Sequence, residues 1–241
     1  MLIDLNNKVA LVTGGTQGIG KAIALSLLSS GARVIYTGRS TDGKTINHPN
    51  AQYEAVDFSN DQSVASFLKT LDNYSIDILI NNAGINKIAA FGDINPEDWL
   101  KIQKVNVEGP FRLCHHLAPK MAQKNFGRII NMGSIFSHVS KEKRGSYSTS
   151  KFALLGMSKA LALDYAASNV LVNVVSPGFI DTELTRNVLS KEELQTLISQ
   201  VPQKRLGKPE EIANLVVFLC SEQNSFINAQ NILIDGGFTS V

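Results

Sequence analysis

Short apolar runs alternate along the chain with segments whose apolar positions recur at helical spacing. The first run, residues 8–13, precedes a stretch in which Ile23 and Leu27 share one helical face before Gly31. This alternation predicts buried parallel strands joined by helices on both faces of a sheet. The expected strands are residues 8–13, 33–37, 52–57, 76–80, 128–132, 170–175 and 231–234, and the expected helices are residues 19–30, 61–71, 96–125 and 145–167.

This order of elements predicts an α/β fold: a single-domain, Rossmann-type, doubly wound parallel sheet of about seven strands, spanning residues 1–241. No linker rich in proline, glycine or serine and no internal repeat divides the chain. The connection between the second and third strands, residues 40–50, is too short and polar for a full helix. Within residues 96–125, Pro110 and Pro119 are expected to make the helix irregular.

The composition of the chain limits the class of protein to which it can belong. The 241 residues are 44% hydrophobic and carry a net charge of +2 with both signs interspersed, so nothing indicates a nucleic-acid-binding arm. Cys114 and Cys220 lie in apolar runs and are expected to be buried free thiols. The N-terminal residues do not resemble a signal peptide, and no apolar run approaches the ~20 residues of a membrane span. We expect a cytoplasmic protein without a metal site.

A glycine-rich turn follows the first strand directly and opens the first helix. Glycines let the backbone turn tightly, and the helix N-terminus offers free N–H groups to a pyrophosphate. The spacing is G-x-x-x-G-x-G, which differs from the G-x-G-x-x-G of most dinucleotide folds, and a plain strand–helix turn is the alternative. The expected cofactor-binding residues of this turn are Gly14, Thr16, Gln17, Gly18, Ile19 and Gly20.

The end of the second strand bears on the choice of dinucleotide. NAD-binding folds place an acidic residue there for the ribose hydroxyl, but this chain has Gly38 followed by Arg39 and Ser40. Arginine pairs well with a phosphate through charge-assisted hydrogen bonds. We therefore expect NADP(H) rather than NAD(H), held by Arg39 with help from Ser40.

Tyr147 and Lys151 stand four residues apart, which places them on one face of a helix. An ammonium group beside a phenol stabilises the phenolate, so the pKa of Tyr147 is expected to lie below its ordinary value of about 10. A tyrosine of that kind exchanges a proton with an alcohol or a ketone. The pair occurs often by chance, and its meaning depends on the motifs around it.

Together these motifs resemble the short-chain dehydrogenase/reductase family over nearly the whole chain. The resemblance rests on Thr13–Gly20, the run Asn81-Asn82-Ala83-Gly84, Asn106, Ser134, the Tyr147/Lys151 pair and Pro177-Gly178. It implies that Tyr147 is the general acid or base, that Lys151 lowers the tyrosine pKa and binds the nicotinamide ribose, that Ser134 holds the substrate oxygen, and that Asn106 orders a water for a proton relay.

The resemblance also implies a set of further cofactor contacts. Asp57 would contact adenine, although an N-cap for the following helix is an equal alternative. The remaining expected residues are Asn82, Ala83 and Gly84 on the adenosine side and Pro177, Gly178, Ile180 and Thr182 around the nicotinamide. Gln17 departs from the basic residue that many NADP-dependent members carry in the turn, which leaves Arg39 to hold the phosphate. Residues 180–202 would form a lid over the substrate.

The substrate itself has several candidates. Residues 173–185 and 201–213 resemble 3-oxoacyl-[acyl-carrier-protein] reductases, but Asn125 and Ser168 stand where two docking arginines are expected. The basic segment 140–144 instead suggests a carboxylate or phosphate on a sugar-like substrate, as in reductases of surface-polysaccharide pathways, or simply a solvated cluster. A dinucleotide-binding regulator would not need all four residues of the tetrad formed by Asn106, Ser134, Tyr147 and Lys151. A nucleotide-sugar epimerase normally needs a larger C-terminal domain.

Residues 152–165 are almost wholly apolar, more so than one sheet-covering face requires. The resemblance implies that this helix and residues 96–125 form a dimer contact and that the last strand completes a tetramer. We expect a homotetramer, with a dimer as the alternative.

Overall fold

All seven strands lie in one parallel sheet in the computed structural model, which describes residues 3–40, 46–188 and 190–241. The strand order is β3-β2-β1-β4-β5-β6-β7, so the chain reverses its direction of winding between β1 and β4. Ligands of such sheets bind at the carboxyl edge near this reversal. The strands are β1 (Val9–Val12), β2 (Arg33–Gly38), β3 (Ala51–Ala55), β4 (Ile78–Asn81), β5 (Gly127–Met132), β6 (Val170–Pro177) and β7 (Asn231–Ile234).

The central strands are apolar on both sides because both faces of the sheet are covered. Successive side chains of a strand point to opposite faces. Val12 and Ile80 accordingly belong to one hydrophobic cluster, while Leu11 and Leu79 belong to the other. All four are fully buried, which explains why these strands appear in the sequence as continuous apolar runs.

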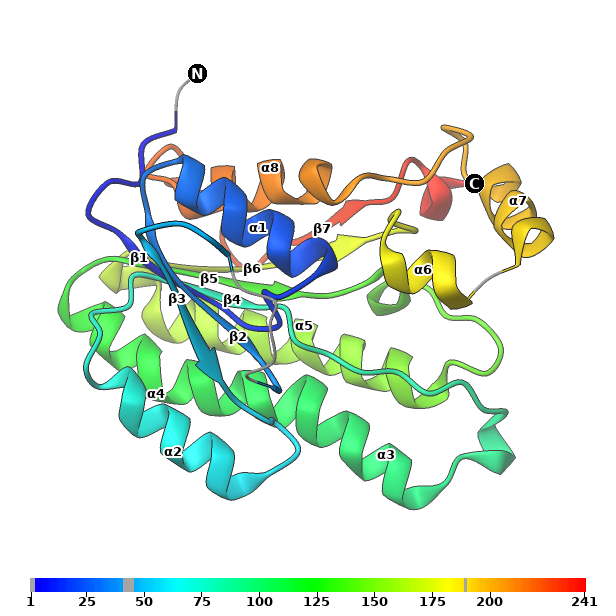
Figure 1. The fold of residues 1–241 in the computed structure, drawn as a ribbon, viewed down its shortest axis with the longest axis horizontal. Helices are drawn as coiled ribbons and strands as arrows, with labels where there is room; N and C mark the ends of the chain where they lie inside the picture. Colours follow the sequence, from blue (N-terminus) through cyan, green and yellow to red (C-terminus); the bar gives the residue numbers. More distant parts are fainter. Residues whose placement is uncertain (1–2, 41–45, 189) are drawn as a thin grey trace.

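Two layers of helices enclose the sheet (Figure 1). Helices α1 (Gly18–Ser29) and α8 (Pro209–Cys220) pack on one face. The other face is covered by α2 (Asp61–Leu71), α4 (Gly109–Gln123) and α5 (Gly145–Tyr165). Cys114 and Cys220 are buried free thiols, as predicted. No helix in the described part of the chain is long and apolar enough to cross a membrane.

The predicted long helix over residues 96–125 is interrupted. It consists of α3 (Pro96–Gln103), a π-helical turn (Lys104–Glu108) and α4. Pro110 lies just after the turn, and a proline inside a regular helix loses one hydrogen bond and crowds the preceding turn. The wider π turn lies where that conflict would arise, and π turns are frequent at functional sites. Pro119, by contrast, stays within α4.

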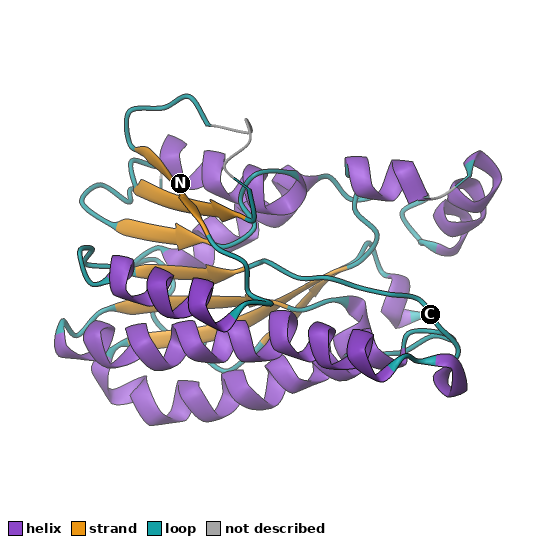
Figure 2. Ribbon diagram, turned by 60° about the horizontal axis from the view of Figure 1, so that its bottom comes forward, coloured by secondary structure: helices purple, strands orange, loops and turns teal. Residues whose placement is uncertain are grey.

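Two helices that the hydrophobic pattern did not indicate lie within residues 180–202. They are α6 (Glu183–Val188) and α7 (Lys191–Gln200), beyond the carboxyl ends of the strands (Figure 2). A reciprocal capping box between Ser190 and Glu193 starts α7. The expectation for residues 40–50 falls partly on residues 41–45, which lie outside the described residues; residues 46–50 contain no helix.

Candidate active site

The turn between β1 and α1 has the shape of a phosphate-binding loop. Gly14 and Gly18 adopt positive φ values of 64° and 55°, which favour glycine. A Cβ on Gly20 would stand 2.3 Å from the carbonyl oxygen of Gly14, so the helix approaches the turn too closely for any side chain. Gln17, the N-cap, is extended and its side chain does not cap the helix. The first N–H groups of α1 thus face the turn, and these residues fit a pyrophosphate.

The motif at the end of β4 braces this turn. The Asn82 side-chain amide donates to the carbonyl oxygens of Thr13 (2.9 Å) and Gly14 (3.1 Å). In return, the Thr13 hydroxyl oxygen accepts from the backbone N–H groups of Asn82 (2.9 Å) and Ala83 (3.0 Å). Gly84 follows beside the catalytic candidates, because a Cβ there would stand 3.4 Å from Asn106 Oδ1 and 3.7 Å from Lys151 Nζ.

Arg39 and Ser40 follow β2 at the same edge of the sheet and are exposed. Thr16 of the turn lies against Gly38, where a Cβ would stand 2.8 Å from the threonine methyl carbon. The Asp57 carboxylate accepts from the hydroxyl (2.7 Å) and the backbone N–H (2.8 Å) of Ser59. These bonds, with the nearby charge of Arg39, hold the pKa of Asp57 below its usual value.

The N-cap alternative for Asp57 is wrong, because the side chain of Asn60 caps α2 by accepting from the backbone N–H of Ser63 at 3.0 Å.

The four residues of the predicted tetrad converge at the carboxyl ends of β4 and β5. Ser134 follows β5, and Tyr147 and Lys151 occupy consecutive turns of α5. The Ser134 side chain lies close enough to the Tyr147 phenol to lower its pKa. Lys151 Nζ lies 5.5 Å from the centre of the Tyr147 ring and donates to the Met132 carbonyl at 2.7 Å. These contacts bring a hydroxyl, a phenol and an ammonium group to one place.

Asn106 is buried in the π turn and bound on both sides of its amide. Its Oδ1 accepts from the backbone N–H of Ile85 at 2.8 Å. Its Nδ2 donates to the carbonyl of Ile85 (2.9 Å) and to the Ser150 hydroxyl (3.0 Å). The side chain therefore joins the segment after β4 to the helix that carries Tyr147 and Lys151.

The electrostatics of the tyrosine differ from the expectation. Burial raises the pKa of Tyr147 above its ordinary value, and the Ser134 side chain and the charge of Arg144 only partly oppose this. Burial also lowers the pKa of Lys151 to about 8. The expectation that the tyrosine pKa lies below its ordinary value is thus wrong for this arrangement, because desolvation outweighs the two opposing effects.

The predicted nicotinamide side lies across from the tetrad. Pro177, the last residue of β6, pairs with Ile234, and Gly178 lies so close to Asp235 that a Cβ would stand 2.7 Å from its Cα. Ile180 is buried and forms a β-bridge with Gly207. A Cβ on Gly18 would stand 3.6 Å from the methyl carbon of Thr182. The start of residues 180–202 therefore touches the glycine-rich turn.

Phe136 and Arg144, which are not members of the predicted tetrad, also lie beside it. The Phe136 ring packs edge-on to the Tyr147 ring, with 6.3 Å between centroids, and Arg144 Cζ lies 5.5 Å from the centre of the Phe136 ring. The signal for Phe136 was its place between Ser134 and Tyr147, whereas Arg144 belongs to the basic segment 140–144 that the sequence linked to an anionic group on the substrate.

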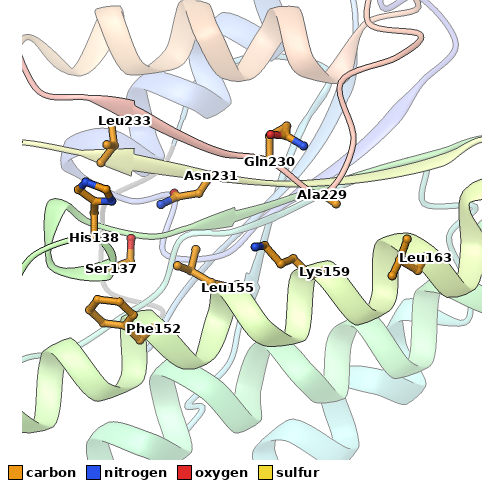
Figure 3. Close-up of a pocket in the computed structure, with 10 residues that line it drawn as sticks. All are labelled: Ser137, His138, Phe152, Leu155, Lys159, Leu163, Ala229, Gln230, Asn231 and Leu233. Carbon is orange, nitrogen blue, oxygen red and sulfur yellow. The ribbon is translucent and has the colours of Figure 1, made fainter.

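A separate pocket lies between α5 and β7. Figure 3 shows α5 side chains facing the segment that leads into β7. Tyr147 and Lys151 do not line this pocket. Its lining residues are Ser137, His138, Phe152, Leu155, Lys159, Leu163, Ala229, Gln230, Asn231 and Leu233.

Known proteins share both this fold and this sequence. A family model described as enoyl-(acyl carrier protein) reductase matches residues 14–239. A 3-oxoacyl-[acyl-carrier-protein] reductase of Aquifex aeolicus is 40% identical over 247 residues, which cover 98% of this chain and 99% of the relative. An acetoacetyl-CoA reductase of Shinella zoogloeoides is 38% identical over 236 residues, which cover 96% and 98% of the two chains.

Solved structures that superpose on this chain are dehydrogenases of the same fold. A gluconate 5-dehydrogenase from Burkholderia cenocepacia, in complex with NADP and tartrate, superposes with a TM-score of 0.91 at 29% identity and covers 99% of this chain and 97% of its own. A short-chain dehydrogenase/reductase family protein gives a TM-score of 0.92 at 31% identity, covering 99% and 100%. The chain therefore belongs to the short-chain dehydrogenase/reductase family and is an oxidoreductase with the Rossmann-type fold that its sequence predicts.

Proposed function

We propose that this enzyme uses NADP(H) to reduce a ketone, or to oxidise the corresponding secondary alcohol, with Tyr147 as the group that transfers the proton. The observation that carries the proposal is the convergence of three groups at the end of β5. Ser134 lies close enough to Tyr147 to act on its pKa, and Lys151, one turn further along α5, lies 5.5 Å from the centre of the Tyr147 ring. Two hydroxyl groups so placed can both donate a hydrogen bond to one carbonyl oxygen.

NADP(H) supplies the hydride in this reaction. Ser134 hydrogen-bonds the substrate oxygen and keeps it beside the Tyr147 hydroxyl, which gives its proton as negative charge develops on that oxygen. The raised pKa of Tyr147 keeps the phenol protonated and ready to donate at neutral pH. The ammonium group of Lys151 favours the phenolate left behind, and Asn106 fixes the helix turn that carries both residues.

The preference for NADP(H) is supported by the end of β2 and by a relative. Arg39 lies exposed next to the glycine-rich turn and its charge reaches Asp57, as expected of a group at the adenosine rim. The similar gluconate 5-dehydrogenase was solved with NADP. The whole set of cofactor contacts given above, including those of the glycine-rich turn, remains a prediction.

The proposal is tested by comparing the wild type with Tyr147→Phe on a panel of acyl thioesters, keto sugars and keto acids with NADPH. We expect the variant to lose at least about a hundredfold in kcat, since the proton donor alone is removed, while NADPH still binds. Full turnover by Tyr147→Phe would contradict the assignment. A matched Tyr165→Phe variant, at the far end of α5, should keep wild-type kcat.

A second candidate is the reduction of an acyl thioester on a carrier protein. Relatives named for that activity are up to 40% identical to this chain over nearly its full length. Against it, Asn125 and Ser168 provide no cation where docking arginines are expected, and both lie just before β5 and β6, at the amino edge of the sheet. Weak turnover of an acyl-carrier-protein thioester relative to a small thioester would count against this candidate.

Surface features support the predicted homotetramer. Leu100 (65% exposed) and Phe111 (53%) border a groove shared by α3, α4 and α5. Leu163 (76% exposed) borders the pocket beside β7, which is paired only with β6 among the described strands. Large exposed apolar residues gathered in this way are typical of subunit contacts. A cytoplasmic location and the role of residues 180–202 as a lid stay predictions.

A further inference from the structure

Arg144 stands at the entrance to α5, three residues before Tyr147. It occupies the N-cap position, and its carbonyl oxygen accepts from the backbone N–H of Ser148 at 2.8 Å. Its guanidinium carbon lies 5.5 Å from the centre of the Phe136 ring, and that ring packs edge-on to the Tyr147 ring. The guanidinium and the phenol thus share a neighbour, and the positive charge reaches the Tyr147 hydroxyl.

The guanidinium of Arg144 is half-buried but forms no ion pair with a carboxylate of the described chain. Arg112, Arg186 and Arg205 each have such a partner: Asp61, Asp181 and Glu211, respectively. Burial lowers the pKa of Arg144 from its usual value, and the effect that opposes it comes from Tyr147 rather than from a carboxylate. A partly desolvated cation without a counterion is costly unless something else binds it.

The other cations of the same segment do not share this position. The side chains of Lys141 and Lys143 are exposed, so water and salt screen their charges. Lys87 lies in the segment after β4 and already forms an ion pair with Asp98 at 2.5 Å. Of the basic residues around the tetrad that are described here, Arg144 combines a place beside Tyr147 with the lack of a carboxylate partner.

We propose that Arg144 binds a carboxylate of the substrate, so that the preferred substrate is an oxo acid whose ketone lies a few bonds from its carboxylate. This inference rests on the proposed function, because it takes the reacting carbonyl to lie at Tyr147 and Ser134. A guanidinium binds a carboxylate through two parallel hydrogen bonds, which fixes orientation as well as distance. Reduction then adds one hydride to the carbonyl carbon and one proton to its oxygen, and the carboxylate is unchanged.

The experiment compares three oxo acids with their methyl esters, using NADPH: pyruvate, acetoacetate and levulinate. The acids place the ketone at increasing distance from the carboxylate, and each ester removes the charge at the cost of one added methyl group. We expect the wild type to prefer at least one acid over its ester by about tenfold or more in kcat/KM. Arg144→Gln should lower kcat/KM for that acid by about 10–100-fold and for the ester by less than about threefold.

Matched variants separate recognition from folding. Lys141→Gln makes the same charge change on an exposed residue of the segment and should leave the preference intact. Arg144→Lys should restore only part of it, because an ammonium group cannot form the paired hydrogen bonds. NADPH affinity and Tm should be unchanged in Arg144→Gln. A loss of NADPH binding in that variant would overturn the inference, since the residue would then serve the cofactor or the fold.

The inference is also overturned if the wild type favours every ester, or if Arg144→Gln lowers acid and ester equally. Preference for a phosphorylated ketone over all three acids would overturn the carboxylate assignment. Tyr147-dependent reduction of neutral ketones, with no reduction of the acids, would overturn the inference and leave the proposed function standing. Absence of Tyr147-dependent reduction of any carbonyl would contradict the proposed function itself.

Discussion

The ammonium group of Lys151 donates a hydrogen bond to the backbone carbonyl of Met132, 2.7 Å away. Met132 ends β5, so this bond ties the catalytic helix to the carboxyl edge of the sheet. The side chain of Lys151 is only 4% exposed and forms no ion pair with the described residues. Burial without a counterion lowers its pKa to about 8. The charge on the group that adjoins Tyr147 is therefore sensitive to moderately alkaline pH.

The lowered pKa of Lys151 predicts a pH-dependent stability. The folded-state pKa of about 8 lies below the ordinary value of 10.5, so the unfolded chain binds this proton more readily. Stability contributed by this group should be constant below about pH 8 and rise between about pH 8 and 10.5. Relative to Lys151→Met, the wild type should gain roughly 2–3 kcal/mol in free energy of unfolding across that window.

Urea unfolding of the wild type and Lys151→Met at a series of pH values measures this gain. Groups elsewhere titrate equally in both proteins, so the difference between the two curves isolates Lys151. Parallel curves from pH 7 to 10 would show that the lysine keeps its ordinary pKa in the folded protein.

Gly20 should tolerate no side chain. Its Cβ would stand 2.3 Å from the carbonyl oxygen of Gly14 and 2.4 Å from Asn82 Nδ2, and the first of these is backbone that cannot rotate away. We expect Gly20→Ala to lower the free energy of unfolding by about 2 kcal/mol or more and to weaken NADPH binding, since the turn must open. Thermal unfolding and NADPH titration measure the two effects.

Gly92→Ala is the matched control for this prediction, because a Cβ at Gly92 would meet nothing within 4 Å. The Tm of Gly92→Ala should stay close to the wild-type value, as is usual for a surface substitution. Equal Tm values for the two variants would mean that the helix does not approach the turn as closely as described.

Arg39 should decide between the two dinucleotides. Arg39→Ala is expected to weaken NADPH binding by about 10–100-fold, the contribution of charge-assisted hydrogen bonds to a phosphate, and to leave NADH binding unchanged. Fluorescence titration with each cofactor measures the ratio. Arg33→Ala, at the start of the same strand and bound to Gln52, should change neither affinity. Comparable affinity for both cofactors in the wild type, unaffected at Arg39, would remove the role given to this residue.

The strands of the sheet were predictable because helices cover both of its faces, which makes each central strand a continuous apolar run in the sequence. Every predicted strand is present, with ends that differ by at most two residues, and the prediction for α2 is correct at both ends. The apolar runs carry this information locally. Pro110 predicted an irregularity in the long helix, but not the form of the π turn at Lys104–Glu108. The hydrogen bonds of Asn106 in this turn go to Ile85 and Ser150, which are 21 and 44 residues away in the sequence.

The chemistry of the site was only partly predictable. Spacing alone placed Tyr147 and Lys151 on one helix face, and the motifs supplied Ser134 and Asn106. The direction of the tyrosine pKa shift depends on burial by the whole fold, which pairwise reasoning about two side chains omits. The distinction between Arg144 and its basic neighbours likewise depends on exposure: the sequence shows three cations, and the structure places one of them beside Phe136.

The apolar groove over α3, α4 and α5 should be a subunit contact. Phe111 is 53% exposed and lines this groove with Leu100 and Met157. Phe111→Glu would place a charge in a surface that assembly removes from water, so we expect the subunit dissociation constant to rise by about a hundredfold or more. Light scattering coupled to size exclusion should show a tetramer for the wild type and a smaller species for the variant.

Leu25→Glu is the control, because Leu25 is similarly exposed, at 43%, but lies on α1 across the sheet from this groove. It should keep the wild-type mass. A wild type that is monomeric at micromolar concentration, or a Phe111→Glu variant that remains tetrameric, would show that the groove is not the contact and that the exposed apolar residues serve another purpose.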